Sequence, residues 1–248
     1  MVGPDLVPAG TLPSFLRWMV LGLVFAAGAT LQAKGLLSGL YSYRTDVLYL
    51  VRGHLYLALA SGLLAILIGI PIGILLTRRR FLLLGMVLGQ VVNLGTTIPT
   101  LAILALAMTV LGLGAPSAIF GLTALTLLPI VLNTAAGLNA VPRHLIEAAR
   151  GMGMRPHQIL LQVELPNALY VMLAGIRTAL AIDIGTVPLA FLIGGGGLGE
   201  LIFSGIDLNE PTMLLAGAIP TTLLALGVDR LIGLVQFFVV PRGVNPLR

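Results

Sequence analysis

The chain has 248 residues, of which 58% are hydrophobic and only 9% are charged, and its formal net charge is +5. Soluble domains carry about 25% charged residues, so a chain with so few charges could not cover its surface in water. The composition excludes an ordinary soluble protein, and the scattered basic residues form no basic face with interleaved aromatic residues that would indicate nucleic-acid binding.

Long apolar stretches predict an all-α membrane protein of about six transmembrane helices, since about 20 apolar residues cross a bilayer. The stretches cover residues 15–32, 55–77, 82–112, 116–136, 170–193 and 212–238. The first could instead be a cleavable signal peptide, because Arg17 precedes an apolar run that ends in Leu31-Gln32-Ala33. The third is too long for a simple crossing and contains Ile98-Pro99, so we expect a broken or steeply tilted helix there.

The basic residues predict the orientation of these helices, because cytoplasmic loops are enriched in lysine and arginine. Alternating spans place Lys34, Arg44 and Arg52 on one side. The other eleven basic residues lie on the opposite side: Arg17, Arg78, Arg79, Arg80, Arg143, Arg150, Arg155, Arg177, Arg230, Arg242 and Arg248. We therefore expect that side to be cytoplasmic, with both termini inside.

The most polar stretch is the predicted cytoplasmic loop 137–169, between the fourth and fifth spans. Pro142 suits the first turn of a short helix, which Gly151 and Gly153 can end. Pro156 can open a second short helix that runs to residue 163. The pattern indicates a helix–turn–helix at the membrane surface, either docked on a partner or serving as a solvated connector with no partner.

The residues of this loop resemble the EAA loop of ABC importer permeases. The resemblance is carried by Glu147-Ala148-Ala149, Gly153, Ile159 and Leu165-Pro166, with the spacing of that motif. In that family the loop docks into a groove of the cytoplasmic ATPase subunit. The resemblance implies an ATPase-coupling role for nine residues: Glu147, Ala148, Ala149, Arg150, Gly151, Gly153, Arg155, Leu165 and Pro166.

The resemblance extends over residues 53–238. The segments 98–101, 128–130, 175–179 and 195–199 are similar to the glycine betaine, carnitine and choline importers of that family. It implies a type I importer core of five helices in the cytoplasmic (inner) membrane of a bacterium or archaeon. The implied partners are a second permease copy or paralogue, two ATPase subunits and an extracytoplasmic substrate-binding protein.

This resemblance also divides the chain. We expect an extra helix and an extracytoplasmic linker in 1–52, the transmembrane domain in 53–238, and a cytoplasmic tail in 239–248. The chain contains no GxxxxGK[ST] phosphate loop, so we expect it to bind no cofactor, with ATP and Mg²⁺ on the separate ATPase.

Polar residues within apolar spans are candidates for a translocation pathway, because they are costly in lipid. Five residues are of this kind: Gln90, Asn93, Thr97, Asn133 and Asp183. Asp183, read as the only mid-span acid, either helps a cationic substrate electrostatically or is a hydrogen-bonded structural residue. The alternative for Gln90 and Asn93 is that their amides cross-link helices. The glycine run 194–197 is either a flexible outer turn or a gate or docking site for the binding protein.

No residue pattern indicates catalysis or metal binding. Cysteine is absent, and His54, His144 and His157 lie far apart and are expected at the membrane interface. An intramembrane enzyme is therefore disfavoured. An ion-coupled secondary transporter is the other alternative; it would need ion-coupling sites and often internal repeats, and we see no clear repeat between the halves of the chain. The predicted function is thus the permease subunit of an ATP-driven importer of a small osmolyte-like solute, with an importer of an unrelated solute as the other ABC alternative.

Overall fold

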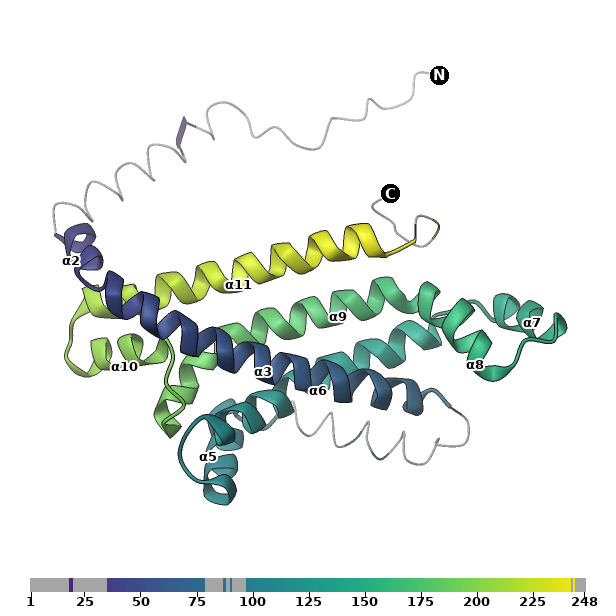
Figure 1. The fold of residues 1–248 in the computed structure, drawn as a ribbon, viewed down its shortest axis with the longest axis horizontal. Helices are drawn as coiled ribbons and strands as arrows, with labels where there is room; N and C mark the ends of the chain where they lie inside the picture. Colours follow the sequence, from purple (N-terminus) through teal and green to yellow (C-terminus); the bar gives the residue numbers. More distant parts are fainter. Residues whose placement is uncertain are drawn as a thin grey trace.

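The computed structural model describes residues 18–19, 35–78, 87, 90, 97–241 and 243, and every regular element in these residues is helical (Figure 1). The elements are α2 (Leu36–Ser42), α3 (Arg44–Leu76), α5 (Thr100–Leu111), α6 (Ala115–Asn139), α7 (Arg143–Gly151), α8 (Pro156–Ile159), the π-helical turn η2 (Leu160–Glu164), α9 (Leu165–Thr186), the 3₁₀ helix η3 (Val187–Ile193), α10 (Gly199–Asp207) and α11 (Pro211–Val239).

Four helical segments of the described chain are long and apolar enough to cross a membrane: Arg44–Leu76, Ala115–Asn139, Pro156–Ile193 and Pro211–Val239. They correspond to the predicted second, fourth, fifth and sixth spans. The first predicted span lies outside the described residues, apart from residues 18–19.

The predicted interruption of the third span is confirmed. Residues 97–99 are not helical, and α5 begins directly after Pro99, whose ψ of 136° is extended. Proline has no N–H to donate and crowds the preceding turn, which explains why the helix restarts here. Most of the span before this break lies outside the described residues.

Helices α3, α6 and α9 pack closely around one another and form the centre of the bundle (Figure 1). Small residues allow the approach: a Cβ added to Gly73 of α3 would lie 2.5 Å from the Cβ of Thr134 in α6, and one added to Gly175 of α9 would overlap Asn133. Lipid offers no hydrophobic driving force between helices, so membrane bundles depend on such close packing.

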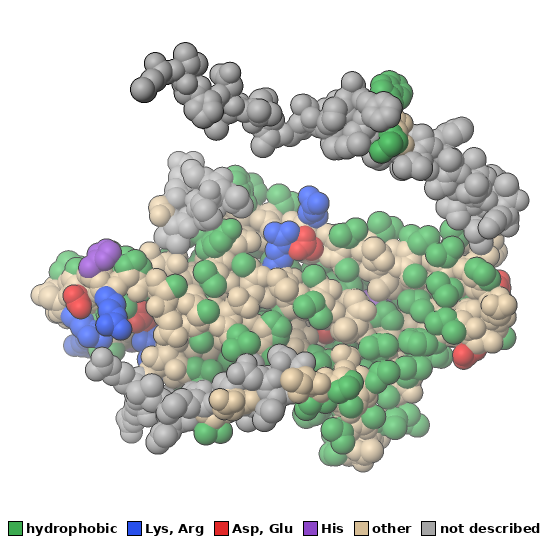
Figure 2. All heavy atoms as spheres, turned by 180° about the vertical axis from the view of Figure 1, so that it is seen from behind, with side chains coloured by type: hydrophobic (Ala, Val, Ile, Leu, Met, Phe, Trp, Pro, Cys, Tyr) green, Lys and Arg blue, Asp and Glu red, His purple; other side chains and the backbone are tan. Residues whose placement is uncertain are grey.

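The two ends of the bundle differ in composition. One end carries α7 and α8, and the other carries α2 and α10 (Figure 1). We refer to them as the loop end and the opposite end. Charged side chains gather at the loop end, whereas hydrophobic side chains and backbone cover most of the middle (Figure 2). Helix α10 was not expected from the sequence, which predicted only a turn after the fifth span.

His54 differs from the prediction that it lies at the membrane interface. Its side chain is fully buried in α3, and its Nε2 lies 3.1 Å from the backbone carbonyl oxygen of Ile184 in α9. A buried imidazole needs such a partner because desolvating a polar group is costly. His144 and His157 are exposed at the loop end.

Candidate functional site

The loop between α6 and α9 consists of two short helices, as predicted. Pro142 is extended, with a ψ of 129°, and α7 follows it directly. Gly153, with a φ of +78°, takes the left-handed conformation that turns the chain towards α8. Gly151 is still helical, so only one of the two glycines makes the turn.

The second helix does not end at residue 163 as predicted. It continues through η2 into α9, and residues 159, 160 and 165 all keep right-handed helical dihedrals. Pro166 accounts for the wider π-helical turn, because a proline cannot donate to the carbonyl four residues earlier and its ring crowds that carbonyl. The second part of the loop, from Pro156 onwards, is therefore the beginning of the transmembrane helix itself.

The Glu147-Ala148-Ala149 segment of α7 presents two residues outwards and one inwards. Glu147 and Ala148 are exposed, whereas Ala149 is 1% exposed and packs on the chain itself. Ala149 thus packs α7 against the rest of the chain and is not accessible to a partner. Arg150, Gly151, Gly153 and Arg155 are also exposed. Leu165 and Pro166 are half-buried at the start of α9.

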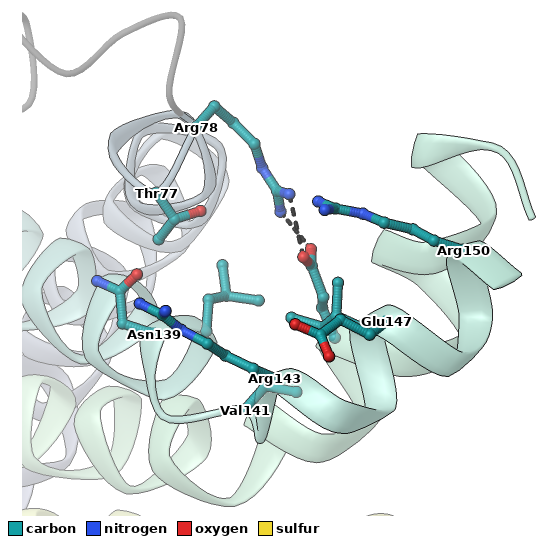
Figure 3. Close-up of a pocket in the computed structure, with 10 residues that line it drawn as sticks. Thr77, Arg78, Asn139, Val141, Arg143, Glu147 and Arg150 are labelled. Atoms are coloured by element: carbon teal, nitrogen blue, oxygen red, sulfur yellow. Dashed lines mark hydrogen bonds and ion pairs between the residues drawn. The ribbon is translucent and has the colours of Figure 1, made fainter.

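A pocket of about 500 Å³ lies between α7 and the loop ends of α3 and α6 (Figure 3). Its charged lining consists of Arg78, Arg143, Arg150, Glu147 and Glu164. Figure 3 shows Arg78, which follows α3 by two residues, facing the side chains of α7 across this space. With three arginines and two carboxylates, the pocket has a positive balance and suits an anionic or mixed polar surface.

An ion pair that was not expected from the sequence connects this loop to the segment directly after α3. Arg78 donates to Glu164 through Nη2–Oε2 at 2.5 Å and Nη1–Oε1 at 3.2 Å. Glu164 is 9% exposed, so its carboxylate requires a partner. The only sequence signal was an acid directly before Leu165-Pro166, within an otherwise apolar stretch.

The predicted pathway residues do not form one cluster among the described residues. Asn93 lies outside them, Gln90 is exposed on a helical turn, and Thr97 is exposed beside the break at Pro99. Asn133 packs against Gly175, and its amide donates to the carbonyl of Pro129 at 2.8 Å. Asp183 follows Gly175 by eight residues, which is about 12 Å along α9.

Asp183 is 1% exposed and is held between α3 and α9. Its Oδ2 lies 2.7 Å from Oγ of Ser61, whose hydroxyl is also 2.8 Å from the carbonyl of Leu57. Its Oδ1 has no hydrogen-bond partner within the described part of the chain. This geometry supports the structural interpretation of Asp183, since the carboxyl group is enclosed between two helices.

The prediction that Asp183 is the only mid-span acid is wrong. Asp229 lies within α11 and forms a two-point ion pair with Arg177 of α9, with distances of 2.5 Å for Nε–Oδ1 and 2.6 Å for Nη2–Oδ2. Arg177 therefore lies in the middle of its span, where it pairs with a partly exposed acid of another helix, and is not a topological charge at a span end. The sequence alone does not show that an arginine in one span contacts an acid in another span.

Comparisons with known proteins agree with this architecture. A family model described as "Binding-protein-dependent transport system inner membrane component" matches residues 69–241. The osmoprotectant import permease protein OsmY of Salmonella typhimurium is 52% identical over 196 residues, which cover 79% of this chain and 83% of that protein.

Further relatives extend the comparison. The carnitine transport permease protein OpuCB of Listeria monocytogenes is 42% identical over 79% of this chain and 88% of that protein. Among solved structures, the inward-facing MetNI methionine ABC transporter is similar, with a TM-score of 0.72 and 24% identity over 79% of this chain and 96% of that one. The latter likeness concerns the fold alone.

Proposed function

Because this chain belongs to the family of inner membrane components of binding-protein-dependent transport systems, and is therefore a permease subunit of an ABC importer, we propose that its cargo is a small osmoprotectant such as glycine betaine, carnitine or choline. The 52% identity to an osmoprotectant import permease carries this proposal. Other relatives are named for carnitine, choline and glycine betaine transport, which share a compact quaternary amine.

The proposed partners are separate ATPase subunits that supply ATP and Mg²⁺, a second permease copy or paralogue, and an extracytoplasmic binding protein. We place the loop end on the cytoplasmic side of the inner membrane, with both termini inside. Arg78, Arg143, Arg150 and Arg155 lie at that end, which supports this orientation. Arg44 and Arg52 lie near the start of α3, towards the opposite end.

The proposed mechanism transmits movement of the ATPase through the loop 143–164. Exposed Glu147 and Ala148 contact the ATPase, and Arg150 and Arg155 lie beside them. Because the second helix of the loop, from Pro156, continues into α9 without a break, its displacement moves a transmembrane helix directly. Rigid-body movement of this kind opens a cavity alternately to the two sides of the membrane.

Uptake by the reconstituted complex tests the cargo. Proteoliposomes that contain this chain, its ATPase and its binding protein should accumulate labelled glycine betaine on addition of ATP. Unlabelled choline and carnitine should compete, whereas methionine should not. Accumulation of none of the three amines by a complex that hydrolyses ATP would contradict the proposed cargo.

The variant Glu147→Lys tests the docking role of α7. It adds a positive charge beside Arg143 and Arg150, and we expect capture of the ATPase and uptake to fall by about tenfold or more. Asp207→Lys is the matched control, because it makes the same charge change at an exposed position at the opposite end. Normal capture of the ATPase and normal uptake by the Glu147→Lys variant would contradict the proposal that α7 is the docking element.

A further inference from the structure

Helix α11 is attached to the rest of the chain in two different ways along its length. Near the opposite end it packs closely on α10, where a Cβ added to Gly217 would lie 2.7 Å from Ile202 and 2.8 Å from the carbonyl of Leu198. Over its most apolar window only 6% of α11 is buried, against 28–44% for the other three long helices. Within this window α11 therefore has a smaller share of buried residues than the other three helices.

Towards the loop end, α11 also makes polar contacts with α9. Arg177 and Asp229 form the two-point ion pair, and Gly233, one turn further along α11, leaves room for the guanidinium, whose Nη1 would be 3.3 Å from an added Cβ. Gln236, which is 6% exposed, donates to the carbonyl of Tyr170 at 3.1 Å. In Figure 2 a small group of blue and red side chains stands among hydrophobic atoms on the surface of the bundle.

The ion pair, of which 38% of the Arg177 side chain and 27% of the Asp229 side chain are exposed, differs physically from apolar contact. Apolar side chains can slide past one another at little cost, whereas separating Arg177 from Asp229 would leave two charges among apolar surroundings. A bidentate guanidinium–carboxylate pair also fixes direction as well as distance. The pair therefore resists displacement of α9 relative to α11.

From this arrangement we propose that the Arg177–Asp229 pair is the positioning contact that makes α11 move with α9 when the loop 143–164 is displaced. The proposal rests on the proposed coupling function. Helix α9 receives the movement because η2 joins it to the loop, and α11 follows because the pair does not separate. Neither residue is required to touch the cargo.

Transport per ATP hydrolysed by the reconstituted complex tests the pair. Arg177→Gln and Asp229→Asn should each lower this ratio by about tenfold while the complex still assembles and hydrolyses ATP. The exchanged double variant Arg177→Asp/Asp229→Arg should restore most of the ratio. Tyr43→Phe is the matched control, because it removes a polar contact with Glu210, beside the other end of α11 (Oη–Oε1, 2.7 Å), and should leave the ratio unchanged.

Two results would overturn the proposal. One is a normal ratio in both single variants. The other is a proportional fall of ATP hydrolysis and transport together with a lower melting temperature, which would indicate a purely structural contact. If the exchanged variant does not assemble, the single variants still decide between these outcomes.

A distance measurement separates this proposal from the cargo assignment. The chain has no cysteine, so spin labels can be placed at Ile182→Cys of α9 and Leu226→Cys of α11, both exposed. The label distance should stay constant between the nucleotide-free and ATP-bound complex, and it should change once Asp229→Asn is added. A distance that changes without the variant would contradict the proposal, whichever solute is transported.

Discussion

The two ends of the long helix that contains α9 are built in opposite ways. At the loop end, α7 and α8 are exposed and charged, and a Cβ added to Gly151 or Gly153 would meet nothing within 4 Å. At the opposite end, most of η3 is buried or half-buried, and residues 197–199 of the glycine-rich segment 194–199 are buried. There a Cβ on Gly197 would lie 3.4 Å from the Cα of His54, and one on Gly199 would collide with the backbone of Pro188.

The difference shows that glycines with a similar sequence context have different physical roles. In the loop they shape the backbone and keep a surface open, whereas at the opposite end they permit close backbone approach. The segment 194–199 is thus a packed turn in which Gly197 and Gly199 are buried. A gating or docking role for the more accessible Gly194 and Gly196 stays a prediction.

The largest effect should come from Gly199→Ala. The added methyl group meets the carbonyl group of Pro188, which is backbone and cannot rotate away, so we expect destabilisation by about 3 kcal/mol or failure to fold. Gly185→Ala is the matched control, because the same methyl group would meet nothing within 4 Å. Thermal unfolding of the purified permease in detergent measures both, and equal melting temperatures would contradict the packed-turn interpretation.

Asp183 should give an intermediate effect that depends on the substitution. Asp183→Leu leaves buried Ser61 without its carboxyl partner and should cost about 2 kcal/mol of stability. Asp183→Asn keeps a polar group that can donate to Ser61, so we expect nearly normal stability and uptake. Loss of uptake by Asp183→Asn in a stable, assembled complex would instead favour electrostatic help for a cationic cargo.

The smallest effects on stability should come from the loop glycines. Gly153→Ala places a side chain at a φ of +78° and should cost about 1 kcal/mol, although there is space for it. Gly151→Ala should be neutral or slightly stabilising, because residue 151 is helical and alanine favours helix by up to about 1 kcal/mol. The melting temperature should be highest for Gly151→Ala, intermediate for the wild type and lowest for Gly153→Ala. The reverse order would contradict this prediction.

The sequence predicted the helical elements well, because the bilayer imposes a length and an apolar composition on each span. The interruption at Pro99 and the start of α7 after Pro142 were predicted for the same local reason, since proline restricts its own backbone and lacks a donor. The end of α8 was predicted wrongly because a π-helical turn accommodates Pro166 without breaking the helix.

By itself, the amino-acid sequence determined that this chain needs a bilayer, where its long helices run, and that a polar loop joins two of them, because these properties depend on local composition. Only the tertiary structure decided which polar groups meet: Ser61 with Asp183, Arg78 with Glu164, and Arg177 with Asp229, which are 122, 86 and 52 residues apart. Such pairs depend on how the helices rotate and slide against one another, and that arrangement is set by close packing of small residues across the whole bundle.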